Sequence, residues 1–161
     1  MLRLASFDVV FREVPGETTL ALNLSECPNR CPGCHSPHLR EAVGEPLDEE
    51  LLEGVLTRYG GSITCVCFMG GDADPQEVAR LSGCVRTRSR GALKTGWYSG
   101  REELPPEVDR RQFDYIKLGP YVERLGGLDS PRTNQRFYRI GADGEMTDRT
   151  ADFRQRGPEA L

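Results

Sequence analysis

The sequence predicts an α/β protein with a mainly parallel sheet, on the evidence of three features. Strand-like segments alternate with segments of helical spacing, which is the order of βαβ units. Residues 62–69 form a nearly continuous apolar run, typical of a strand buried on both faces. Glycine follows this run and two later strands, as expected where a chain turns out of a sheet. With 161 residues, of which 37% are hydrophobic, the chain is long enough for one core but too short for a closed eight-fold barrel.

The individual elements follow from periodicity and from end signals. The predicted strands cover 18–24, 62–69, 93–98 and 113–118, with two short strands around a turn between 136 and 150. Helices are predicted between Pro46 and Gly60 and from Asp74 to about Gly83, because apolar side chains recur there at helical spacing. We therefore expect one domain over residues 1–150, followed by a polar tail at 151–161.

Charge and hydropathy exclude two classes of partner. The formal net charge is -4, and no run of lysine and arginine predicts a stripe that tracks a phosphate backbone. No segment approaches the roughly 20 apolar residues of a membrane helix, and the first residues show no export signal. We expect a cytoplasmic protein that binds neither nucleic acid nor a membrane.

Polar and glycine-rich motifs follow the predicted strands. Ligands of parallel sheets bind beyond the carboxyl ends of the strands, so these motifs should lie together at one edge. They are the cysteine loop 27–34, Gly70-Gly71-Asp72, Tyr98-Ser99-Gly100 and Gly119-Pro120.

The cysteine loop carries the most specific signal. Cys27, Cys31 and Cys34 have spacings of four and three residues, so a short loop can wrap them around a metal centre. Three thiolates suit an iron-sulfur cluster with one open iron. A closed zinc site is the alternative, with His35 or His38 as fourth ligand.

These residues resemble a known family. The motif C-x-x-x-C-x-x-C after the first strand is the signature of radical S-adenosylmethionine enzymes. The wider pattern resembles the anaerobic ribonucleoside-triphosphate reductase activating proteins, over roughly residues 5 to 140. The matching segments are Asn23 to His35, the Gly70-Gly71 loop, Trp97-Tyr98-Ser99-Gly100, Asp114 to Tyr121 and Asn134-Gln135-Arg136.

The resemblance implies a fold, a reaction and partners. The fold would be the partial (β/α) barrel of radical S-adenosylmethionine enzymes, with one 4Fe-4S cluster on Cys27, Cys31 and Cys34. S-adenosylmethionine would bind the open iron and be cleaved to a 5′-deoxyadenosyl radical, which in this family leaves a glycyl radical on the anaerobic reductase. A flavodoxin or ferredoxin would supply the electron. No catalytic side chain is implied beyond the cluster ligands. The residues that would contact S-adenosylmethionine are Gly70, Gly71, Asp72, Ser99 and Asn134.

Two positions depart from the superfamily pattern. Gly33 stands where an aromatic residue commonly precedes the third cysteine, although the pair Pro32-Gly33 is typical of the activase family. The usual Gly-Gly-Glu loop ends here in Asp72, whose side chain is one methylene shorter. The backbone carbonyls of the glycine turn remain able to receive the ammonium group of the cofactor.

Other interpretations stay open at this point. Ser99 is either a cofactor contact or an ordinary turn serine, and the role of Asn134-Gln135-Arg136 is open. A second cluster would need Cys65, Cys67 and Cys84, which we interpret instead as core thiols. The rival functions are activation of another glycyl radical enzyme and a non-enzymatic zinc or iron-sulfur binding module.

Overall fold

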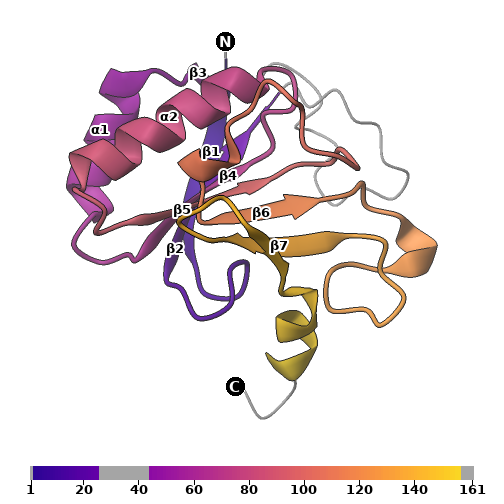
Figure 1. The fold of residues 1–161 in the computed structure, drawn as a ribbon. Helices are drawn as coiled ribbons and strands as arrows, with labels where there is room; N and C mark the ends of the chain where they lie inside the picture. Colours follow the sequence, from indigo (N-terminus) through magenta and orange to yellow (C-terminus); the bar gives the residue numbers. More distant parts are fainter. Residues whose placement is uncertain (1, 26–43, 157–161) are drawn as a thin grey trace.

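The chain forms an α/β fold around one sheet. The computed structural model describes residues 2–25 and 44–156. These residues form an eight-stranded sheet of order β3-β1-β2-β4-β5-β6-β7-β8, whose outer strands do not pair with each other, so hydrogen bonds do not close it into a barrel (Figure 1). The strands are β1 (Arg3–Val10), β2 (Thr19–Leu24), β3 (Glu45–Pro46), β4 (Cys65–Met69), β5 (Lys94–Tyr98), β6 (Tyr115–Leu118), β7 (Arg136–Ile140) and β8 (Met146–Asp148). The described helices are α1 (Glu49–Tyr59) and α2 (Pro75–Arg88), with short 3-10 helices η2 (Arg110–Gln112), η3 (Glu123–Leu125) and η4 (Thr150–Arg156).

The sheet is mixed rather than mainly parallel. Its four central strands, β2, β4, β5 and β6, pair in parallel, whereas the flanking strands pair antiparallel. The β1–β2 and β7–β8 connections are too short for a crossover, which requires antiparallel pairing. The strand β1 was not predicted, and a register shift between Leu4 and Ser6 interrupts its alternation of apolar and polar side chains.

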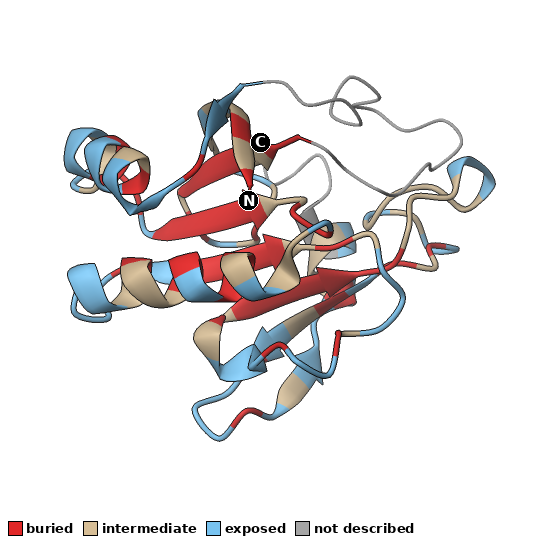
Figure 2. Ribbon diagram, turned by 90° about the horizontal axis from the view of Figure 1, so that it is seen from above, coloured by how far each residue is buried: buried red, intermediate tan, exposed pale blue. Residues whose placement is uncertain are grey.

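Both helices cover the same face of the sheet (Figure 1). Apolar side chains of α1 and α2 share one core cluster with side chains from all four central strands. Figure 2 shows that the central strands are mostly buried, whereas the helices alternate between buried and exposed residues. Asp48 and Asp74 cap the two helices by accepting from the backbone N–H of Leu51 (2.8 Å) and Glu77 (3.4 Å).

The second helix is longer than its sequence pattern indicates. Gly83 was expected near its end, but α2 continues to Arg88 because Val85 is fully buried in the core. A Cβ at Gly83 would lie 2.8 Å from Gln112 Oε1, so the glycine lets η2 approach the helix. Ser82 reinforces this contact by donating from Oγ to the carbonyl of Gln112 at 2.5 Å.

The opposite face of the sheet has a smaller apolar cluster. Its buried members are Val14, Cys65, Cys67, Tyr115 and Phe137. The Phe153 ring of η4 packs edge-on against Phe137 with ring centroids 5.0 Å apart, so the tail predicted at 151–161 begins with residues that contact the domain. The helices in the described part of the chain are too short or too polar to cross a bilayer.

Candidate functional site

The glycine turn after β4 lies at the carboxyl edge of the parallel strands. Gly70 and Gly71 have φ angles of +104° and +89°, which other residues rarely adopt. A Cβ on Gly71 would lie 2.5 Å from Val78 Cγ2 and 3.0 Å from Leu24 Cδ1. A Cβ on Gly70 would lie 3.4 Å from the carbonyl oxygen of Leu24. The turn therefore packs against the last residue of β2, the strand that leads into the cysteine segment.

Asp72 ties this turn to the loop after β5. The side chain is buried, with 1% of its surface exposed. Its Oδ1 accepts from Ser99 Oγ at 2.6 Å, and its Oδ2 accepts from the N–H of Gly100 at 2.8 Å. Arg101 donates from its N–H to Ser99 Oγ (3.0 Å) and from Nη2 to the carbonyl of Asp72 (2.9 Å). Asp72 and Ser99 are thus brought together as predicted, and both oxygens of the carboxylate accept bonds from the protein itself.

The carbonyl groups of the turn are also hydrogen-bonded. Trp97 Nε1 donates to the carbonyl of Gly70 at 2.7 Å, and the N–H of Asp74 donates to the carbonyl of Gly71 at 3.0 Å. A carbonyl oxygen has two lone pairs, so each can accept one further bond. Any ammonium group received by this turn would use the second lone pair of a carbonyl that is already held in place.

Asn134 reaches the same edge through the loop after β6. Its Nδ2 donates to the carbonyl of Pro120 at 2.9 Å, while its Oδ1 is buried and has no hydrogen-bond partner among the described residues. The N–H of Gly119 donates to the carbonyl of Arg101 at 2.6 Å, which joins this loop to the Asp72 network. A buried acceptor without a donor is costly, so Asn134 Oδ1 is a place where a ligand donor would stabilise the protein.

Two further side chains at this edge were not among the predicted site residues. Lys117 is 7% exposed, donates from Nζ to the carbonyl of Gly119 at 3.1 Å and lies 5.5 Å from the Tyr98 ring centroid. Arg101 holds the Asp72 loop as described above. A lysine inside the predicted strand 113–118 was the available signal for Lys117, because strands of a parallel sheet are commonly buried and a buried cation needs acceptors.

The predicted cluster ligands Cys27, Cys31 and Cys34 lie outside the described residues, as do His35 and His38. The other three cysteines do not share a site. Cys65 and Cys67 belong to the sheet face away from the helices, whereas Cys84 lies on α2 and donates from Sγ to Glu49 Oε1 at 3.3 Å. Within the residues that the structure describes, no three His, Cys, Asp or Glu side chains are grouped to hold a metal. Burial raises the pKa of the Cys65 and Cys67 thiols, which is consistent with inert core thiols.

The opposite, amino edge of the parallel strands holds a second buried carboxylate. Glu17 Oε2 accepts from Tyr115 Oη (2.6 Å) and Lys94 Nζ (2.9 Å), and Glu17 Oε1 accepts from Thr64 Oγ1 (2.7 Å). Burial by itself raises the pKa of Glu17, but the bonds from Tyr115, Lys94 and Thr64 outweigh it and lower the pKa below its ordinary value. Burial, followed by the bond to Glu17, raises the pKa of the Tyr115 hydroxyl.

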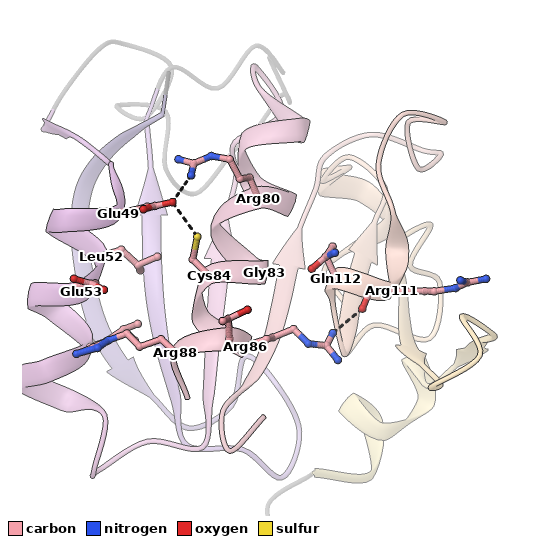
Figure 3. A pocket seen from close by; sticks show the side chains of 12 residues that line it. Glu49, Leu52, Glu53, Arg80, Gly83, Cys84, Arg86, Arg88, Arg111 and Gln112 are labelled. Carbon is pink, nitrogen blue, oxygen red and sulfur yellow. Dashed lines mark hydrogen bonds and ion pairs between the residues drawn. The ribbon is translucent and has the colours of Figure 1, made fainter. Parts of the chain in front are cut away.

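A groove of about 840 Å³ runs between α1, α2 and η2 on the outer side of the helical layer. In Figure 3 its walls carry the ion pair of Arg80 with Glu49 (2.5 Å), and Arg86 donates from Nη1 to the carbonyl of Arg111 at 2.7 Å. Its lining residues come from α1, α2 and η2. It contains none of the predicted site residues.

Comparisons with protein-family models, with curated proteins and with solved structures give no match for this chain.

Proposed function

We propose that this protein is a radical S-adenosylmethionine activase that generates a glycyl radical on an anaerobic ribonucleoside-triphosphate reductase. The fold would be the partial (β/α) barrel of that superfamily, a form with which the open sheet, its four parallel central strands and the helices on one face are compatible. Cys27, Cys31 and Cys34 would hold the 4Fe-4S cluster, and a flavodoxin or ferredoxin would reduce it. When bound, the cluster supplies the electron that cleaves S-adenosylmethionine.

The observation that carries the proposal is the contact between the glycine turn and the end of β2. Gly70 and Gly71 pack against Leu24, and the three cysteines follow within the next ten residues of the chain. A cofactor turn and a cluster loop must be neighbours if one small molecule is to touch both. The order of the motifs along the chain and this contact at the sheet edge both favour one site that includes the turn and the cysteines.

The residues at the edge fit the polar end of S-adenosylmethionine. The glycine turn leaves no room for a side chain at Gly71 and presents carbonyl oxygens with a free lone pair each. Asn134 Oδ1 is a buried acceptor without a donor among the described residues. Asp72 and Ser99 would act by holding the turn rather than by direct contact, since the carboxylate accepts from Ser99 and Gly100.

The first experiment tests the chemistry. The protein would be purified without oxygen, loaded with iron and sulfide, reduced and assayed for release of 5′-deoxyadenosine from S-adenosylmethionine. We expect release from the native protein and from Cys84→Ala, a thiol on α2, and none from Cys31→Ala. A well-formed cluster without any release would refute the enzyme and leave an iron-sulfur binding module, whereas tightly bound zinc would indicate the zinc module.

A second experiment tests the client. The reduced protein with S-adenosylmethionine would be mixed with the cognate anaerobic reductase, and the glycyl radical would be detected by electron paramagnetic resonance. A radical on the reductase supports the proposal. If 5′-deoxyadenosine is released but a radical forms only on another glycyl radical enzyme, the protein is an activase of that enzyme and not of the reductase.

A further inference from the structure

We propose that a groove at the amino edge of the sheet binds a polyphosphate anion. The groove has a volume of about 500 Å³ and lies where β5 and β6 begin and β7 ends. This is the edge of the sheet opposite to the one with the glycine turn. This volume is within the range of small-molecule sites in proteins. The proposal depends neither on iron nor on S-adenosylmethionine.

The lining of this groove is strongly cationic. Five cationic side chains face one carboxylate, although the whole chain has a net charge of -4. The cations come from α2, β5, η2, β7 and the turn after β8, which is why the sequence shows no basic run. They are Arg86, Lys94, Arg111, Arg139 and Arg149, and the carboxylate is Asp114.

The single carboxylate does not neutralise these cations. Asp114 Oδ2 accepts from the backbone N–H of Thr95 at 2.9 Å, so part of its hydrogen-bonding capacity is used by the sheet. Lys94 and Arg149 are paired instead with carboxylates that do not line the groove, Glu17 (2.9 Å) and Asp152 (3.0 Å). The remaining guanidinium groups therefore determine the charge inside the groove.

Arg111 and Arg139 are the groups that a ligand would engage first. Neither guanidinium donates a hydrogen bond to a residue that the structure describes, and both side chains are exposed. Arg86 donates to the carbonyl of Arg111, which fixes the backbone beside the groove; in Figure 3 the Arg111 side chain extends away from the Arg80–Glu49 pair. Gly144 packs against Arg111, since a Cβ there would lie 3.1 Å from its Nε.

A polyphosphate suits this arrangement better than a single small anion. Guanidinium groups bind phosphate oxygens through paired, charge-assisted hydrogen bonds, and several adjacent phosphates can meet several arginines at once. A concave site of this size also fits a small ligand rather than a protein surface. The apolar residues Ile140 and Ala142 also line the groove.

The test is calorimetric titration of the purified protein with inorganic triphosphate at about 0.1 M salt, without divalent cations. We expect saturable binding that weakens at least about tenfold in Arg139→Gln and in Arg111→Gln, because each variant loses a charge-assisted pair of bonds. The matched control is Arg136→Gln on the same strand, an exposed arginine that pairs with Asp148 (3.6 Å) outside the groove, and it should bind within twofold of the native protein.

Two results would overturn the proposal: triphosphate binding no tighter than sulfate at equal ionic strength, or equal weakening in all three variants. Urea unfolding of each variant verifies that it is folded. Titration with ATP then distinguishes a nucleotide ligand from inorganic polyphosphate. Tighter binding of ATP than of inorganic triphosphate indicates a nucleotide ligand, and equal binding indicates that only the phosphates are recognised.

Discussion

The two edges of the parallel strands each contain a buried carboxylate, but the partners of the two carboxylates differ. At the carboxyl edge, Asp72 accepts from neutral donors, the Ser99 hydroxyl and the Gly100 N–H. At the amino edge, Glu17 accepts from the Lys94 ammonium as well as from Tyr115 and Thr64. One carboxylate organises loops beyond the strands, and the other holds the starts of the strands together.

This difference assigns different tasks to the two edges. The loops after β4 and β6 contain glycines with positive φ angles, at Gly70, Gly71 and Gly119, and Asn134 Oδ1 is a buried acceptor without a donor among the described residues. A buried acceptor without a donor costs stability and is typical of a ligand site. In the Glu17 network both carboxylate oxygens accept hydrogen bonds, from side chains at or beside the starts of three strands, which is typical of a structural brace. The following predictions test this difference between the carboxyl edge and the amino edge.

Removal of the Asp72 carboxylate should have the largest effect. Asp72→Ala leaves a buried hydroxyl and a buried N–H without their acceptor, and we expect the free energy of unfolding to fall by about 4 kcal/mol. Asp72→Asn keeps one acceptor oxygen and should lose about half as much. Urea unfolding measures both, with the exposed Glu102→Ala as control. A loss below about 1 kcal/mol for the alanine variant would show that the Asp72 carboxylate does not hold the loops after β4 and β5 together.

A methyl group at Gly71 should be the next most damaging change. Gly71→Ala adds a Cβ 2.5 Å from Val78 Cγ2 in a fully buried contact, and it places alanine at a φ of +89°. We expect a loss of about 3 kcal/mol from strain and overpacking together.

The control for this change is Gly91→Ala. Gly91 has a similar φ of +79° but nothing within 4 Å of the added Cβ, so only the backbone cost of about 1 kcal/mol should remain. The difference between the two variants isolates the packing of the turn against β2 and α2. Equal losses would show that the turn is not tightly packed there.

The sequence predicts the local features of the carboxyl edge but not the long-range contacts of the amino edge. The strand ends, the glycine turn and the proximity of Asp72 to Ser99 follow from local patterns and from the rule for parallel strands. The Glu17 brace was not predicted, because Glu17 lies 98 positions from Tyr115 and reads as an ordinary loop residue. A contact of that range depends on the tertiary fold, which no local pattern encodes.

The same limit applies to the sheet as a whole. The parallel centre was predictable from buried apolar strands between helices, whereas β1 was missed, and a register shift between Leu4 and Ser6 breaks its alternation. The length of α2 was underestimated, since Gly83 resembles a stop signal but serves to admit Gln112. The α/β class and the two short strands β7 and β8 were therefore predictable, whereas β1, β3 and the mixed character of the sheet were not.

Glu17→Gln should produce a smaller loss that depends on pH. The pKa of Glu17 is lowered from its ordinary value of 4.5 in the folded protein, so the carboxylate stabilises the fold above about that pH. As the pH falls through the folded pKa, Glu17 becomes protonated and this contribution disappears. We expect a loss of about 1.5 kcal/mol at pH 7 that shrinks toward zero at acidic pH.

Urea unfolding across a pH series measures this dependence, with Glu103→Gln as an exposed control. A difference between native protein and Glu17→Gln that stays constant down to pH 3 would show that ionisation of Glu17 does not contribute.

The smallest effect should come from Lys94, whose side chain is 46% exposed while its partner Glu17 is 7% exposed. Solvent screens an ion pair of this kind, so Lys94→Met should cost only about 0.5 kcal/mol, and less at high salt. Unfolding at about 0.05 M and 0.5 M sodium chloride would measure the change. The cost of Asp72→Ala should fall less with salt, because the carboxylate is buried and the Ser99 hydroxyl and the Gly100 N–H that donate to it are neutral. If salt reduced both costs equally, the two edges would not differ in their electrostatics, and the neutral character of the carboxyl-edge network would be refuted.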